Sequence, residues 1–280
     1  MKIICCAVLL LAAVLCSAQI NKNFRSLEEA KRAPDSVQWL TLRGAGFTSF
    51  PVEILQFKNL KYLDLSNNGF GVIPDEIRSL SDLVFLDLSG NAVKTLPLGF
   101  SSLKNLKNLY LDYNGSIDLE HDLKILSNLP MLQVLDITGD SIRQVPSSIG
   151  KLSNLRYLTL SGNQIRSLPG EFNQLRNLQI LSINNDEVFD VEGSIPLLAQ
   201  LPALRELHLE GNHIKQLPKS ISWLKTLESL YLNDNELQSL PREVKEMPRL
   251  RYLDMRHNRV PHIQQGALDD ELSPRIVIRF

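Results

Sequence analysis

Cysteine is scarce in this chain of 280 residues, which has only Cys5, Cys6 and Cys16. All three lie near the N-terminus, and none occurs beyond Cys16. If that segment is removed, the rest of the protein has no disulfide and no thiol for catalysis or metal binding. Its stability must then come from packing.

An excess of charge of either sign is also lacking. Lys and Arg number 30 and Asp and Glu 31, so the formal net charge is −1. This balance gives no polybasic surface for nucleic acid or anionic lipid. The chain has no GxSxG, no HExxH and no glycine-rich phosphate loop, which are motifs of hydrolases, metalloproteases and nucleotide-binding enzymes. We therefore expect a non-enzymatic protein with no cofactor and no metal site.

The apolar run near the N-terminus is too short to span a membrane. Lys2 precedes the run IICCAVLLLAAVL, and CSAQ follows it. A basic start, an apolar region of about 7–15 residues and small residues before a cleavage point describe a secretory signal peptide, whereas a spanning helix needs about 20 apolar residues. We predict a signal peptide at residues 1–18, cleaved after Ala18. The alternative, a lipid anchor at Cys16, fits less well because Leu15 and Ala13 do not match a bacterial lipobox.

Leucine recurs at a fixed period through most of the chain. The segment LKYLDLSNNGFGVIP (60–74) matches LVFLDLSGNAVKTLP (83–97) and LRYLTLSGNQIRSLP (155–169). The step from one repeat to the next is 23, except for two steps of 26. The starts are Val37, Leu60, Leu83, Leu106, Leu132, Leu155, Leu178, Leu204, Leu227 and Leu250.

These ten copies resemble the leucine-rich repeat family, whose pattern is L-x-x-L-x-L-x-x-N-x-L, over residues 37–265. The resemblance implies an α/β solenoid of about 10–11 coils, with a curved parallel sheet on the concave side and a helical or irregular convex side. The continuation LPxxIxxLxxL is similar to a subclass found in bacterial cell-envelope proteins and in intracellular scaffolds that bind Ras-type GTPases. The signal peptide favours the bacterial group, and the chain lacks the disulfide caps of secreted animal members.

The residues within one repeat have distinct structural roles. Leu63 and Leu65 fall on one face of a short strand because side chains alternate along a strand. Asn68 ends the strand, where its amide can satisfy backbone groups of the turn. Pro74 suits the first turn of the helical segment that follows, because its missing N–H costs little there. The positions equivalent to Asn68 hold Asn91, Asn114, Asp140, Asn163, Asp186, Asn212, Asn235 and Asn258, and those equivalent to Pro74 hold Pro51, Pro97, Pro146, Pro169, Pro218 and Pro241.

Two caps are predicted for the ends of the solenoid. At residues 19–36, Ser26 followed by Glu28 and Glu29 indicates the start of a capping helix, because acids favour the first turn. At residues 266–280, an eleventh coil starting at Ser273 would place Ile276 and Ile278 at the two strand-leucine positions, so a closing strand is expected there.

The two longer coils begin at Leu106 and Leu178. Both lose the proline and carry an acidic segment instead, IDLEHDL or FDVEGSI. The added length is close to one helical turn of about 3.6 residues, so each is predicted to have a longer convex helix with acids near its start. The starts Leu60, Leu132 and Leu204 are equally spaced along the chain, which suggests duplication of a three-coil unit.

The family resemblance implies that partners bind the concave face, whose side chains alternate with the strand leucines. Aromatic residues flanked by acids suit a protein partner with basic groups, although both residue types are also common consensus fillers. His208 and His257 are two coils apart, which favours solvated histidines over a metal site. The candidate binding residues are Trp39, Tyr62, Asp64, Phe85, Asp87, Tyr110, Asp112 and Tyr113 toward the N-terminus, Tyr157 in the middle, and His208, Glu210, Tyr231, Asp254 and Arg256 toward the C-terminus.

The sequence therefore predicts a monomeric protein-interaction or adhesion module, secreted or held in a bacterial cell envelope, with no membrane span after cleavage. A protein or peptide ligand is the favoured partner class. Glycan or cell-wall recognition is the first alternative, since aromatic platforms also stack on sugar rings. An intracellular scaffold of the Ras-binding type is the second, and it requires residues 1–18 not to act as a signal peptide.

Overall fold

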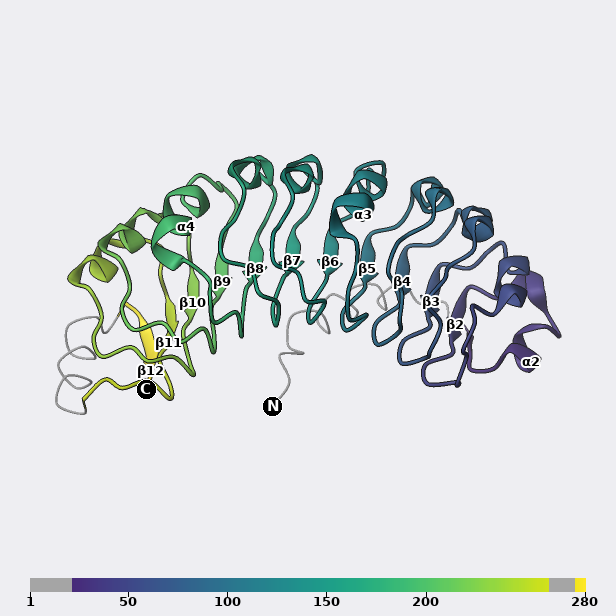
Figure 1. Cartoon of the computed structure of the whole chain (residues 1–280), viewed down its shortest axis with the longest axis horizontal. Coiled ribbons are helices and arrows are strands. Elements are labelled where there is room, and N and C mark those ends of the chain that lie inside the picture. The colour runs from purple at the N-terminus through teal and green to yellow at the C-terminus, as the bar shows by residue number, and fades with distance from the viewer. Residues whose placement is uncertain (1–21, 262–274) are drawn as a thin grey trace.

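Twelve parallel strands form a single sheet in the order of the chain in this computed structural model, which describes residues 22–261 and 275–280. The coils follow one another along an arch, with helical segments on its convex edge (Figure 1). The predicted signal peptide and all three cysteines lie outside the described residues. The strands are β1 (Asn23–Phe24), β2 (Trp39–Thr41), β3 (Tyr62–Asp64), β4 (Phe85–Asp87), β5 (Asn108–Tyr110), β6 (Val134–Asp136), β7 (Tyr157–Thr159), β8 (Ile180–Ser182), β9 (Glu206–His208), β10 (Ser229–Tyr231), β11 (Tyr252–Asp254) and β12 (Val277–Arg279).

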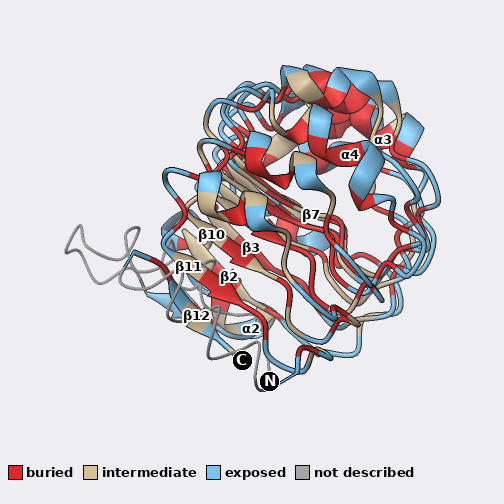
Figure 2. Cartoon of the chain, turned by 90° about the vertical axis from the view of Figure 1, so that its left-hand side faces the viewer, coloured by how far each residue is buried: buried red, intermediate tan, exposed pale blue. Residues whose placement is uncertain are grey.

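The strand leucines stack in register from coil to coil. Leu40 pairs with Leu63 and Leu63 with Leu86, and the same register continues along the sheet. These leucines are fully buried, whereas the aromatic residues before them are only half-buried. The buried apolar residues of successive coils form one hydrophobic core. Residues coloured as buried occur both along the strands and in the helical segments (Figure 2). The repeat pattern thus gives a parallel leucine-rich repeat solenoid, as predicted.

The convex segments of the shorter coils are short 3-10 helices. Each begins after a proline, which occupies the capping position with an extended backbone, as at Pro74 with φ −70° and ψ 150°. The prediction that this proline lies within the first helical turn is therefore wrong, because the helix begins just after it. An extended proline there still fixes the backbone where the chain turns from the inner to the outer side. These helices are η2 (Val52–Gln56), η3 (Asp75–Ser79), η4 (Leu98–Ser102), η5 (Ser147–Lys151), η6 (Gly170–Gln174), η7 (Lys219–Trp223) and η8 (Arg242–Glu246).

The two longer coils carry the predicted α-helices, α3 (Leu119–Leu126) and α4 (Val191–Leu198). Asp118 caps α3 by accepting a hydrogen bond of 3.0 Å from the N–H of His121. Asp190 caps α4 in the same way, at 3.0 Å from the N–H of Gly193. A side-chain acceptor at the N-cap satisfies a backbone donor that has no partner within the helix. The extra residues are therefore part of the scaffold.

The N-terminal cap contains more structure than the sequence predicts. Ser26 caps helix α2 (Leu27–Ala30) and accepts from the N–H of Glu29 at 3.2 Å, as expected. A short 3-10 helix, η1 (Pro34–Ser36), leads into the first repeat. Strand β1 is an addition to the predicted cap, and it pairs with β2. Phe24 in this strand is 2% exposed, so the strand covers the apolar end of the first repeat.

The closing strand β12 is present, but its predicted register is wrong. Ile278 pairs with Leu253, the first strand leucine of the preceding coil. The sequence pattern predicts Ile276 in that position instead. Ile276 is nevertheless 3% exposed, and Phe280 packs against the core after Ile278. Residues 262–274, where the predicted boundary between repeats and cap falls, lie outside the described part of the chain.

The asparagine ladder is confirmed by its hydrogen bonds. The amide of Asn163 donates to the carbonyls of Ile137 at 3.0 Å and Leu160 at 2.6 Å. Its oxygen accepts from the N–H groups of Asp140 and Ile142, both at 3.0 Å. One side chain therefore satisfies backbone groups on two neighbouring coils.

Asp140 occupies a ladder position without an amide. It is 1% exposed, and its Oδ2 has no hydrogen-bond partner among the described residues. Burial raises the pKa of its carboxyl to about 6, against backbone hydrogen bonds from Asn114 and Gly115 that lower it. A buried carboxyl that ionises less readily than in the unfolded chain destabilises the fold at neutral pH.

We predict that Asp140→Asn raises the free energy of unfolding at pH 7 by about 1–3 kcal/mol, because the neutral amide avoids the cost of a buried charge and adds a donor. Below the ordinary aspartate pKa of 3.8, both folded and unfolded Asp140 are protonated, so the difference should shrink as the pH falls from 6 to 4. Urea denaturation at several pH values measures this. Asn163→Asp is the matched control and should destabilise; a less stable Asp140→Asn protein would contradict the argument.

Candidate functional site

The predicted binding residues do not all lie on the strands. Ten of the fourteen are in strands β2–β11. Asp112, Glu210 and Arg256 each come just after a strand and extend the same surface. Tyr113 belongs to the turn beyond, where its φ of 57° is left-handed and its side chain is 64% exposed. Tyr113 therefore lies at the rim of the concave face.

Four aromatic rings form a continuous stack on the N-terminal strands, called here the aromatic ladder: Trp39, Tyr62, Phe85 and Tyr110. The centroids of Trp39 and Tyr62 are 3.9 Å apart and their planes differ by 14°. Tyr62 and Phe85 are 4.1 Å apart at 9°, and Phe85 meets Tyr110 at 5.3 Å with a tilt of 39°. Neighbouring rings of the aromatic ladder cover each other's faces. A ligand on the concave face would therefore contact mainly the edges of these rings.

Four carboxylates lie beside this stack on strands β3–β6 or just after them, called here the acidic row: Asp64, Asp87, Asp112 and Asp136. Asp64 is 8% exposed and accepts hydrogen bonds from Ser66, 2.9 Å from its N–H and 2.6 Å from its hydroxyl. Asp136 accepts from Thr138 in the same way, at 3.0 and 2.6 Å. Ser89 connects the middle of the row, since its N–H donates to Asp87 and its hydroxyl to Asp112. The partners within this row are thus mainly neutral hydroxyl and amide groups.

The acidic row holds protons more tightly than ordinary aspartates. Burial raises the pKa of Asp136 to about 7, with repulsion from Asp112 adding to the effect. Burial also raises the pKa of Asp87 to about 6 and of Asp112 above its ordinary range, although Arg43 opposes the shift at Asp112. A cation placed among these groups would stabilise their ionised forms. Asp136 was not among the predicted binding residues. The sequence does contain a signal for it, because Asp136 occupies the same repeat position as Asp64 and Asp87.

The C-terminal cluster is internally paired. His208 is 7% exposed and stacks on Tyr231 at 4.1 Å and 5°. Its Nδ1 lies 3.2 Å from Glu210 and its Nε2 3.7 Å from Glu206. The prediction of a solvated histidine is therefore wrong for His208, because two carboxylates and a ring enclose it.

Arg256 closes the other end of this cluster. Its guanidinium binds Asp254 through Nε at 2.9 Å and Nη2 at 2.6 Å. Burial favours protonation of Asp254, but these bonds outweigh it and lower its pKa. The exposed His257 pairs with Asp234 at 2.8 Å. No group of three or more His, Cys, Asp or Glu suited to a metal ion occurs in the described parts of the chain.

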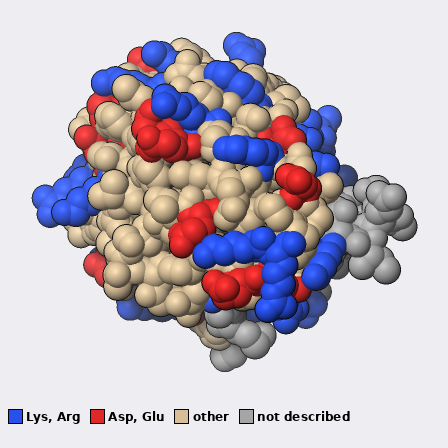
Figure 3. Space-filling view, turned by 90° about the vertical axis from the view of Figure 1, so that its right-hand side faces the viewer, with Lys and Arg blue, Asp and Glu red and all other residues tan. Residues whose placement is uncertain are grey.

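Tyr157 lies on β7 between the two clusters and joins neither ring stack. At the N-terminal end of the arch, positive and negative side chains are interspersed on the surface (Figure 3). Of the helices in the described residues, none is long and apolar enough to cross a membrane.

Two family models match the chain over residues 35–260. The leucine rich repeat model matches residues 35–93, 58–115 and 202–260, and the leucine-rich repeat region model matches 114–201. The chain belongs to the leucine-rich repeat family. Protein–protein interaction is the general function of this fold, and its members are typically not enzymes.

Several solved structures match the chain, and two of them, with TM-scores above 0.5, share its fold. An internalin of Listeria monocytogenes is 21% identical, with 96% of this chain and 92% of that one covered and a TM-score of 0.53. A chain in the Drosophila Toll–Spatzle complex is 25% identical over 86% of this chain and 32% of its own, with a TM-score of 0.70. A leucine-rich repeat protein of Leptospira interrogans is 23% identical over 93% of this chain and all of its own, with a TM-score of 0.44. No curated protein matches significantly.

We predict that His208 makes stability fall at alkaline pH. Burial lowers its pKa, but hydrogen bonds to Glu206 and Glu210 outweigh this and raise it from 6.5 to about 9. The protonated folded form is therefore favoured, and its contribution of about 3 kcal/mol is fully present below pH 6.5 and lost as the pH rises through 9.

Urea denaturation between pH 7 and 10 measures this slope, and His208→Gln should remove most of it. His257→Gln, which changes an exposed histidine, is the matched control and should leave the slope in place. The same slope in both variants would show that another group is responsible.

Proposed function

We propose that the N-terminal half of the concave face binds a basic segment of a protein partner. The observation that carries this proposal is the difference in pairing between the two clusters. The C-terminal acids Glu210 and Asp254 are matched by His208 and Arg256. Among the described residues, no salt bridge reaches any member of the acidic row, which therefore keeps its capacity for cations from outside.

The dimensions of the acidic row fit a short extended peptide. Its four strands span three intervals of about 4.8 Å, or about 14 Å. An extended chain rises about 3.3 Å per residue, so four or five residues of a partner would cover this length. Lysine or arginine would contact the carboxylates while their aliphatic stems pack along the ring edges. The carboxylates of the acidic row and the ring edges of the aromatic ladder lie close enough for one lysine or arginine side chain to contact both.

Glycan recognition is less well supported, because sugar rings stack on open aromatic faces. In the aromatic ladder the inner faces are covered by neighbouring rings at 3.9–4.1 Å. A protein partner can use ring edges, since their positive rim and apolar area suit side-chain packing.

The partner should bind more weakly in acid. A cation favours ionised Asp87 and Asp136, so binding releases protons from groups with pKa values of about 6 and 7. We expect the affinity for a peptide of about eight alternating lysine and alanine residues to fall as the pH decreases from 8 to 5.5. Fluorescence anisotropy of the labelled peptide at low salt measures this dependence.

In the same assay, Asp87→Asn combined with Asp136→Asn should weaken binding about tenfold at pH 8, since two charges at roughly 0.7 kcal/mol each equal 1.4 kcal/mol. Asp82→Asn with Glu171→Gln removes the same charge at exposed positions elsewhere and serves as the control. Equal affinities for the two double variants would exclude the acidic row as the binding site.

We further propose that the protein acts outside the cytoplasm, in a secreted or envelope-bound form, as an interaction or adhesion module. The signal-like residues 1–18 support this location. Expression in a secreting bacterial host followed by N-terminal sequencing is expected to show a start at Gln19. A chain that keeps Met1 would favour the intracellular scaffold, and a lipid-modified Cys16 would favour an anchored form.

A further inference from the structure

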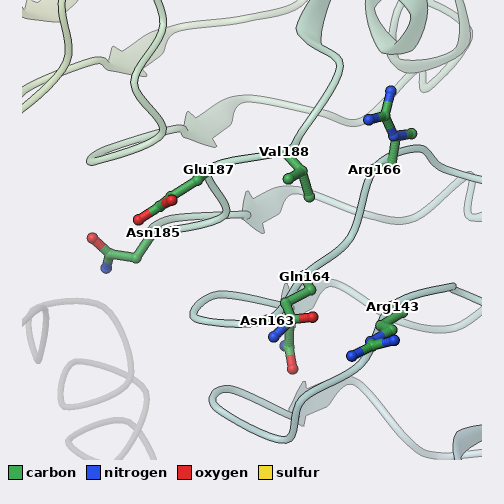
Figure 4. A pocket seen from close by; sticks show the side chains of 7 residues that line it. All are labelled: Arg143, Asn163, Gln164, Arg166, Asn185, Glu187 and Val188. Atoms are coloured by element: carbon green, nitrogen blue, oxygen red, sulfur yellow. The ribbon is translucent and has the colours of Figure 1, made fainter.

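A depression of about 570 Å³ opens beside the middle coils, on the turns that follow β6, β7 and β8. It lies outside the strand columns of the concave face. In the close view of Figure 4, Arg143 and Arg166 lie on one side of it, and Asn185 and Glu187 on the other. The remaining lining residues are Asn163, Gln164 and Val188.

A local change in the repeat pattern accompanies this depression. In the coil before it, the buried apolar residue Ile165 comes two positions after the ladder residue Asn163. In the next coil, the buried residue Phe189 comes three positions after Asp186. The turn is therefore longer in this coil, and Val188 is left 46% exposed. An apolar side chain is thus displayed within an otherwise polar lining.

Two unpaired cations mark the site. Arg143 and Arg166 occupy the same place in adjacent coils, and both are exposed. Neither guanidinium has a salt bridge or hydrogen bond within residues 22–261 and 275–280. By contrast, Arg205 pairs with Glu228 across two adjacent coils. Glu187, the acid in the lining, lies 3.7 Å from His213.

We propose that this depression binds an acidic segment of a protein partner. Two guanidiniums on adjacent coils can each hold one carboxylate, because the planar fork of arginine matches carboxylate geometry. The amides of Gln164 and Asn185 supply further donors, and Val188 provides contact for an apolar side chain between the acids. Glu187 in the lining disfavours a densely charged polyanion such as a sulfated glycan or nucleic acid.

This site is independent of the acidic row. It lies on the turns, it carries the opposite charge, and it requires a different segment of a partner. Its ligand class is therefore testable without knowing whether the concave face binds anything.

Fluorescence anisotropy with a labelled peptide of alternating glutamate and leucine tests the proposal at about 50 mM salt, where charge effects are weakly screened. Arg143→Gln with Arg166→Gln should weaken binding at least tenfold. Arg176→Gln with Arg249→Gln changes the net charge equally at exposed positions elsewhere and should weaken it less than twofold. Both arginines of the site are exposed, and thermal melting of each variant checks that the fold is intact.

A second variant tests the apolar contact. Val188→Ser should weaken the glutamate–leucine peptide severalfold and leave a glutamate–glycine peptide unchanged. Equal losses in the two arginine pairs, no binding of either peptide to the unmodified protein, or competition by heparin that far exceeds competition by the glutamate peptide would each overturn the proposal.

Discussion

The ladder of asparagine side chains is the constraint on which the rest of this structure depends. Each coil ends its strand in a turn whose backbone groups face the neighbouring coils, and buried backbone groups need hydrogen-bond partners. Asn68 supplies them, donating to Leu42 of the preceding coil at 3.1 Å and to Leu65 of its own at 2.8 Å. A residue inserted between strand and ladder would break this pairing. Both longer coils instead place their additions after the ladder, where α3 and α4 form.

Sequence reasoning predicted the parts of the fold that repeat. The alternation of Leu63 and Leu65 and the regular return of this pattern locate the strands, because stacking coils must bury the same positions. At the ends, where only one copy of each pattern exists, it predicted the helix capped by Ser26 and a closing strand, but not the register of β12 or the presence of β1. Ile276 and Ile278 alternate in a way that fits two registers, and the observed one pairs Ile278 with Leu253 and packs Phe280 against the core. Strand β1 has no leucine signal, because it holds one buried residue, Phe24, and otherwise depends on pairing with β2.

The sequence predicts which residues of the candidate site lie side by side, but not which of its charged residues are paired. Parallel register alone places Trp39, Tyr62 and Phe85 side by side. Whether a charged residue is free or already paired depends on side-chain geometry, as the enclosure of His208 shows. The depression at Arg143 and Arg166 was missed entirely. One signal for it was present, namely the shift of the buried residue from the second position after the ladder at Ile165 to the third at Phe189.

A net charge of −1 hides two local imbalances of opposite sign. In a solenoid whose leucines and ladder residues are fixed by stacking, only outward strand positions and turns are free to vary, so specificity must reside there. Surface pairs such as Arg205 with Glu228 leave little field around them. The acidic row and the pair Arg143 and Arg166 keep their local electrostatic fields, because none of these side chains forms a salt bridge among the described residues. A partner with neighbouring basic and acidic segments would pair with both the acidic row and the two arginines. A partner with charges of only one sign would leave one of these two sites unpaired. If one partner occupies both proposed sites, the opposite charges of the acidic row and the two arginines would also fix the direction in which it lies along the coils.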